Sequence, residues 1–161
     1  MTPLPRDPRG GWTLADPDAT AALGAALAVR ARPPQVIALH GPLGAGKTCL
    51  AQGLGAALGH EEVVSPTFAL MIEHPGPQPL LHVDAWRLSP AEARAIGLDE
   101  AIEAWPGLVL VEWADKVEAL LPDDRLNITL LDEGEGSRRL LLGATGPRSE
   151  ALRIALEADL G

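Results

Sequence analysis

The stretch GPLGAGKT, at residues 41–48, decides the fold of this chain. It matches G-x-x-x-x-G-K-[ST], a loop that cradles phosphate groups between a buried strand and a helix. Its glycines let successive backbone N–H groups point at one anion, and the helix that follows presents the positive end of its dipole. The lysine adds positive charge for the outer phosphates, and the threonine hydroxyl suits Mg²⁺. The residues that we expect to contact phosphate are Gly41, Leu43, Gly44, Ala45, Gly46, Lys47 and Thr48.

The sequence on either side of the loop supports this interpretation. Residues 36–39 form a short apolar run with β-branched side chains, which predicts a buried parallel strand. Residues 47–58 carry apolar side chains at helical spacing, and Gly59 is a natural helix end. The strand, loop and helix therefore follow one another in the order that the motif requires.

Length and composition predict one domain and limit its possible partners. We expect residues 1–11, which contain three prolines, to be loosely held, and residues 12–161 to form a P-loop ATPase domain. The net charge of −9 argues against a broad basic face that grips nucleic acid alone, although a basic partner could hold it instead. The first twelve residues lack the apolar core of a signal peptide, and the longest apolar run is too short to cross a bilayer. We therefore expect a cytoplasmic protein that does not enter the membrane.

Strands and helices alternate along the rest of the chain, with two hairpins among them. We expect helices at residues 18–31, 47–58, 90–104 (one or two short ones), 114–121 and 149–160. We expect a first hairpin from residues 68–72 and 80–84, a strand at 108–112, and a second hairpin from 125–131 and 138–145 around a turn at 132–134. This order predicts an α/β fold: a single P-loop NTPase domain whose mixed parallel and antiparallel sheet has helices on both faces.

Two carboxylates end apolar strands and are candidates to complete a Mg²⁺–nucleotide site. Glu112 follows four apolar residues, and Asp84 ends the run that begins at Leu80. We hypothesise that Glu112 serves Mg²⁺, together with Thr48, and that Asp84 orients or activates the attacking water or another nucleophile. The alternatives are a solvated carboxylate for Glu112 and a turn cap for Asp84.

Other polar and aromatic residues allow two interpretations each. Ser65 and Thr67, which flank Pro66, form either a nucleotide-sensing loop or a simple turn. Trp113 either covers the face of a base or packs in the core. Arg87 either reaches phosphate or pairs with an acid. The four histidines lack metal-ligand spacing, so we interpret them as structural.

Four motifs in order give this chain a family resemblance. They are residues 41–48, Ser65-Pro66-Thr67-Phe68, the stretch HVDAWRL at residues 82–88, and Val111-Glu112-Trp113. Together, over about residues 12–145, they resemble the TsaE (formerly YjeE) family of small bacterial ATPases that serve the synthesis of threonylcarbamoyladenosine in tRNA. The loop alone is generic, and the second and third motifs make the resemblance specific. Phe68 and Trp86 stand where the family usually has tyrosine.

The resemblance implies an activity, cofactors and partners. It implies a hydrolase that binds ATP and Mg²⁺, turns ATP over slowly, and associates with TsaD and TsaB, which modify tRNA. The chain would then meet tRNA only indirectly. The family match places Thr48 and Glu112 on Mg²⁺, Asp84 near the phosphates and Trp113 near the nucleotide, and it puts Ser65 and Thr67 in a switch-like loop. It also implies a nucleotide contact from Arg138 or Arg139, and an adenine that borders residues 16–20.

Two other classes of function compete with this one. A P-loop small-molecule kinase has a similar size, loop and carboxylates, but kinases usually carry a lid with several arginines, and residues 90–104 contain only Arg94. A nucleotide-dependent binding switch with negligible turnover is the third possibility. We find no arginine that the sequence places on the transition state, so we expect an ATPase that is weak alone and depends on a partner.

Overall fold

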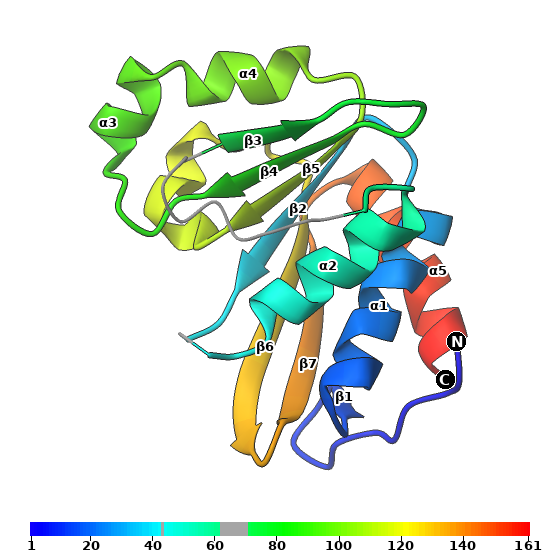
Figure 1. The fold of residues 1–161 in the computed structure, drawn as a ribbon. Helices are drawn as coiled ribbons and strands as arrows, with labels where there is room; N and C mark the ends of the chain where they lie inside the picture. The colour runs from blue at the N-terminus through cyan, green and yellow to red at the C-terminus, as the bar shows by residue number, and fades with distance from the viewer. Residues whose placement is uncertain (43, 62–70) are drawn as a thin grey trace.

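A mixed sheet forms the centre of the molecule (Figure 1). The computed structural model describes residues 1–42, 44–61 and 71–161, and within these ranges the sheet has seven strands in the order β1-β7-β6-β2-β5-β4-β3. The strands are β1 (Trp12–Leu14), β2 (Gln35–His40), β3 (Met71–His74), β4 (Leu80–Asp84), β5 (Leu108–Glu112), β6 (Leu126–Gly134) and β7 (Ser137–Ala144).

The parallel strands lie in the middle of the sheet and the antiparallel pairs at its edges. Strand β2 pairs in parallel with β5 and β6, and β5 pairs in parallel with β4. Strands β3–β4, β6–β7 and β1–β7 are antiparallel pairs. The side chains of β2 and β5 are buried almost throughout, as expected of parallel strands covered on both faces. The predicted mixed sheet is confirmed.

Helices cover both faces of the sheet, as predicted, and divide the interior into two hydrophobic cores. The first face carries α1 (Pro17–Arg30), α2 (Lys47–Ala57) and α5 (Pro147–Leu160). The second face carries α3 (Pro90–Ala95), α4 (Leu98–Ala104) and the 3-10 helix η1 (Ala114–Leu120). Side chains alternate between the faces along each strand, so Ile37 and Leu39 enter the first core whereas Val36 and Ala38 enter the second. Among the described helices, none is long and apolar enough to cross a membrane.

The details differ from the predictions at four places. Strand β3 covers Met71–His74 rather than residues 68–72, of which residues 68–70 lie outside the described part of the chain. The turn of the second hairpin lies at Glu135 and Gly136, not at residues 132–134, because these two residues take positive φ angles (54° and 81°) that suit a two-residue hairpin turn. The helix expected at residues 114–121 is a 3-10 helix with a kink at Val117. Strand β1, which we do not predict, is three residues long and pairs with β7.

The N-terminal segment, expected to be loosely held, makes defined contacts with the C-terminus. The Leu4 N–H donates to the Leu160 carbonyl (2.7 Å), and the Arg6 Nε donates to the Gly161 carbonyl (3.1 Å). Arg9 forms ion pairs with Asp7 and with Glu133, and the two ends of the chain lie close together in Figure 1. Long-range hydrogen bonds and ion pairs of this kind are not visible in a local sequence pattern.

Helices α1 and α2 approach so closely that glycine is required where they cross. A Cβ atom on Gly53 would lie 2.0 Å from the Ala21 carbonyl oxygen, and one on Gly24 would lie 2.3 Å from the Leu50 carbonyl oxygen. Because α2 follows directly from the loop at residues 41–48, this contact holds the helix that begins at Lys47 against the rest of the fold.

We predict that Gly53→Ala destabilises the protein by about 2–3 kcal/mol, because the added methyl group forces two backbones apart. Urea denaturation followed by circular dichroism measures the change. Gly143→Ala is the matched control, since the nearest atom to its new Cβ would be the Asn127 Cβ at 3.9 Å, and it should change stability by less than about 1 kcal/mol. Equal unfolding midpoints for the two variants would contradict the requirement for glycine in α2.

Candidate functional site

The carboxyl ends of three neighbouring parallel strands meet at the glycine-rich loop. In the sheet register, Glu112 at the end of β5 pairs with Leu39 of β2 on one side and with Asp84 of β4 on the other. The loop begins one residue after β2 ends at His40. Open sheets bind their ligands at this edge, outside the carboxyl ends of the strands. The structure thus brings the loop and both predicted carboxylates together.

The loop backbone has the conformation that its glycines permit. Gly41, Gly44 and Gly46 have φ angles of 145°, 79° and 95°, in the left-handed half of φ space. At Gly41 a side chain is also excluded by space, because a Cβ atom would lie 2.3 Å from the Leu130 carbonyl oxygen. Helix α2 starts after Gly46, and within the described residues no side chain caps its first N–H groups. These N–H groups and the helix dipole favour an anion at this position.

Lys47 places a buried ammonium group at the centre of the loop. Only 6% of the residue is exposed, and its Nζ donates to the carbonyl oxygens of Gly41 (2.5 Å) and Pro42 (2.9 Å). Burial lowers the pKa of Lys47, and the negative charges of Glu112 and Asp84 oppose that lowering. The ammonium therefore lies in the field of the two strand-end carboxylates.

The two carboxylates have different surroundings. Glu112 is 3% exposed, so it is not the solvated carboxylate of the alternative interpretation, and its Oε2 lies 2.6 Å from the Nε2 of the buried His82. Asp84 is partly exposed, and its Oδ1 accepts a hydrogen bond from the Trp86 N–H (2.9 Å). This bond is the predicted turn cap, but it uses only one oxygen of the carboxylate, so the cap does not exclude a chemical role for the other.

Two tryptophans lie beside the loop. The centroid of the Trp113 ring lies 3.8 Å from the Lys47 Nζ, and the ring also contacts the second core. Trp113 therefore packs against the core and lies beside the loop, which were the two alternatives that the sequence left open. Its backbone takes a left-handed conformation (φ 56°, ψ 42°), which starts η1. Trp86 stacks obliquely on Trp113, with 4.2 Å between ring centroids, and is 46% exposed.

Of the two candidate arginines, Arg138 is the one that reaches the loop. Its Nε donates to the Ala45 carbonyl (2.7 Å), and its Nη2 donates to the Gly44 carbonyl (2.8 Å). The next residue, Arg139, pairs with Glu133 (3.4 Å) and bonds the Arg9 carbonyl. Because adjacent residues of a strand point to opposite faces, only one of the two can reach the loop.

The remaining predicted residues vary in how far the structure describes them. Leu43, Ser65 and Thr67 lie outside the described residues. Thr48 is exposed in the first turn of α2. The start of α1 lies next to the loop, because the Thr20 Cγ2 is 3.6 Å from where a Cβ on Gly46 would stand. Thr20 therefore lies beside the loop, and the adenine contact of residues 16–20 stays a prediction.

The donor set suits a magnesium ion that a ligand helps to hold. In the described part of the chain no three His, Cys, Asp or Glu side chains cluster as metal ligands would. Mg²⁺ usually takes one or two protein oxygens and completes its shell with water and phosphate oxygens. A threonine hydroxyl in the first turn of α2 and a strand-end carboxylate form such a partial set.

Sequence reasoning misses one residue of the site, His82. We interpret all four histidines as structural, yet His82 bonds Glu112 at the centre of the site. A usable signal exists in the spacing: His82 and Asp84 are two residues apart on one strand, so both side chains point to the same face. The partner across the sheet becomes visible only from the strand order.

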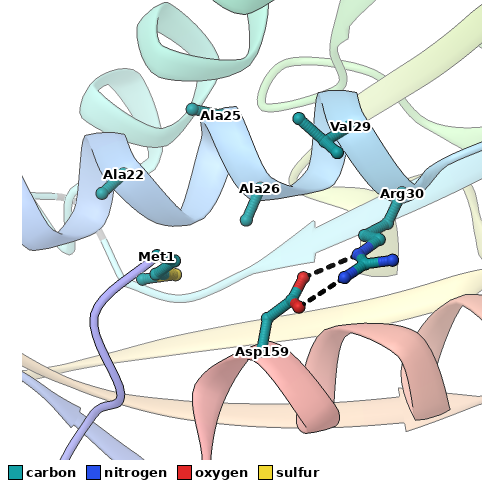
Figure 2. Close-up of a pocket in the computed structure, with 7 residues that line it drawn as sticks. All are labelled: Met1, Ala22, Ala25, Ala26, Val29, Arg30 and Asp159. Carbon is teal, nitrogen blue, oxygen red and sulfur yellow. Dashed lines mark hydrogen bonds and ion pairs between the residues drawn. The ribbon is translucent and has the colours of Figure 1, made fainter.

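A separate cavity lies away from the loop, between α1, α5 and the N-terminus (Figure 2). Its walls are mostly apolar, from alanines of α1, Val29 and Met1. Its charged side chains, Arg30 and Asp159, are paired with each other at 2.6 Å, and the N-terminal ammonium of Met1 also acts on Asp159. With its charges neutralised in this way, the cavity offers much weaker chemistry than the loop.

Comparisons with known proteins point to one family. The model of the family "Threonylcarbamoyl adenosine biosynthesis protein TsaE" matches residues 14–140. A tRNA threonylcarbamoyladenosine biosynthesis protein TsaE from Bacillus subtilis is 38% identical over 143 residues, which cover 88% of this chain and 89% of that protein. A TsaE from Nostoc is 43% identical over 131 residues, covering 78% and 80%. The crystal structure of Bacillus subtilis YdiB superposes with a TM-score of 0.79 and 35% identity, covering 92% of this chain and 93% of that one.

Proposed function

This chain belongs to the TsaE family of threonylcarbamoyl adenosine biosynthesis proteins, and from that premise we propose that it is a Mg²⁺-dependent ATPase subunit. It binds ATP, hydrolyses it slowly, and is required for threonylcarbamoyladenosine modification of tRNA, where it acts on a complex of TsaD-type and TsaB-type proteins. The observation that carries the proposal is the meeting of the loop, Lys47, Glu112 and Asp84 at the edge of the parallel sheet.

Phosphate binding follows from the loop and the start of α2. The backbone N–H groups of the first helical turn point toward the loop, and the Lys47 ammonium adds a mobile positive charge. Trp113 covers one side of that ammonium, which keeps it partly away from water. A partly desolvated cation interacts more strongly with a phosphate group than an exposed one does.

Thr48 and Glu112 are the residues that would hold Mg²⁺. When bound, the ion neutralises charge on the outer phosphates of the nucleotide. Asp84 would take the proton of the attacking water or orient it. In support of this role, its Oδ1 accepts from the Trp86 N–H and its Oδ2 is not needed for that turn. In this proposal Glu112 binds the metal and Asp84 activates the water.

The contacts of Arg138 with the loop lead us to expect weak ATP turnover in the isolated chain. Its guanidinium donates to two loop carbonyl groups and to Asp132, so these donors are not directed at a phosphate group. An arginine that stabilises transition-state charge is worth about 10³–10⁵ in rate. We therefore propose that the partner complex supplies or orders the missing group.

Partner-dependent hydrolysis is the test of the whole proposal. Phosphate release from ATP and Mg²⁺ should rise by about tenfold or more when TsaD-type and TsaB-type proteins are added, since a charge is then supplied in trans. ATP binding without hydrolysis, in either mixture, would instead make the chain a nucleotide-dependent switch. Rapid transfer of phosphate to a metabolite would make it a kinase.

A further inference from the structure

His82 of β4 and Glu112 of β5 form a buried pair at the centre of the site. Their Nε2 and Oε2 atoms are 2.6 Å apart, and the side chains are 0% and 3% exposed. Asp84 and Glu112 face each other in the register of the parallel pair β4–β5, and His82 lies two residues before Asp84. All three side chains therefore leave the sheet on the same face, the one that α2 covers.

The direction of this hydrogen bond follows from the chemistry of its partners. An ionised carboxylate only accepts hydrogen bonds, so the Nε2 of His82 carries the proton and donates to Glu112. The other ring nitrogen, Nδ1, is buried and has no hydrogen-bond partner among the described residues. A buried polar pair with one unsatisfied nitrogen adds little stability compared with apolar side chains of similar size. Packing alone would favour leucine at this position, so the histidine indicates a role in the site.

We propose that His82 is a positioning residue, whose Nε2–H holds the Glu112 carboxylate in the orientation that lets it serve the metal. The inference rests on the proposed function, because it assumes that Glu112 acts on Mg²⁺. Hydrogen bonds to a metal-binding carboxylate fix its orientation, and losing them usually reduces metal affinity or activity by about 10–100-fold.

Lys47 explains why Glu112 needs to be held. Both side chains are buried at the loop, with Lys47 6% and Glu112 3% exposed. Without the bond to His82, the carboxylate would be free to turn toward the Lys47 ammonium. In such an ion pair each charge would neutralise the other. The lysine would then bind phosphate less well, and the glutamate would bind Mg²⁺ less well.

The test compares variants that keep or lose the donor. His82→Gln keeps an N–H donor at about the reach of Nε2, and His82→Leu removes it while preserving volume. His74→Leu is the matched control, because His74 is a partly buried histidine of the adjacent strand whose Nε2 has no partner in the described residues. For each variant the Kd of a fluorescent ATP analogue is measured in Mg²⁺ and in EDTA, and thermal unfolding is followed in parallel.

We expect His82→Leu to lose about 10–100-fold in Mg²⁺-dependent affinity, with little change in EDTA, and His82→Gln to recover most of it. His74→Leu should keep the wild-type ratio of the two Kd values. If His82→Leu does not fold, His82→Asn replaces it, because its shorter amide cannot reach Glu112.

Four outcomes would overturn the inference. A folded His82→Leu protein with the wild-type ratio would show that Glu112 needs no positioning, and equal losses in Mg²⁺ and EDTA would show a merely structural role. In the metal-free protein, ¹⁵N NMR of the imidazole should find Nε2 protonated, and a bare Nε2 would exclude the donor. Wild-type protein that binds ATP equally with and without Mg²⁺ would overturn the proposed metal site together with this inference. The first three outcomes leave the proposed function intact.

Discussion

Lys47→Ala is expected to weaken ATP binding by about 10- to 150-fold while the protein stays folded. Hydrogen bonds to a charged group contribute about 1.5–3 kcal/mol, and the ammonium is the one full positive charge that the loop itself carries. Within the described residues, Lys47 bonds only the carbonyl groups of Gly41 and Pro42 and contacts the Trp113 ring, so its loss removes little from the core. Isothermal titration calorimetry with ATP and Mg²⁺ measures the change.

The control for this variant is Lys116→Ala, which removes the only other lysine of the chain. Lys116 is exposed, and its Nζ lies 5.6 Å from the centroid of the Trp86 ring, outside the loop. We expect its ATP affinity to stay within about twofold of wild type, as for a solvated charge away from the ligand. Undiminished affinity in Lys47→Ala, with the protein folded by circular dichroism, would refute the phosphate assignment of the loop.

The local parts of the fold are predictable because their signals are local. The run at residues 36–39, the glycines of the loop and the apolar spacing after Lys47 are all readable within 25 residues, and the structure has β2, the loop and α2 there. The ends of β4 and β5 are predictable for the same reason, since each apolar run stops at its carboxylate. That Asp84 and Glu112 are neighbours follows only from the strand order, which places β4 beside β5 in parallel.

The parts that sequence reasoning misses depend on pairing between distant residues. Strand β1 is too short to carry a pattern and exists through its ladder with β7. The choice between Arg138 and Arg139 depends on the strand register, where a shift by one residue exchanges the faces. The turn at Glu135–Gly136 competes with the similar Glu133–Gly134 pair two residues earlier, and only the register of β6 and β7 decides between them. His82 likewise gains its partner from β5.

The pairing of His82 with Glu112 also separates the two carboxylates chemically. Glu112 is buried and held by an imidazole, which suits a ligand that must keep one orientation. Asp84 is partly exposed, and among the residues that the structure describes its carboxylate bonds only the Trp86 N–H of its own turn, which suits a group that must meet water. Their different surroundings therefore predict different losses when each is neutralised: metal-dependent binding for Glu112 and turnover for Asp84.

Asp84→Asn is expected to lower partner-stimulated ATP turnover by about 10²–10⁴-fold, the usual contribution of a positioned general base, and to leave the Kd for ATP within a few-fold. The amide oxygen of asparagine can still accept from the Trp86 N–H, so the turn should persist. Single-turnover hydrolysis with Mg²⁺ and saturating partners measures the chemical step, and calorimetry measures binding. Asp99→Asn in α4, on the opposite face of the sheet, is the control and should hydrolyse ATP at the wild-type rate. Near-normal turnover in Asp84→Asn would remove Asp84 from the chemistry, and a parallel loss of Mg²⁺-dependent affinity would assign it to the metal instead.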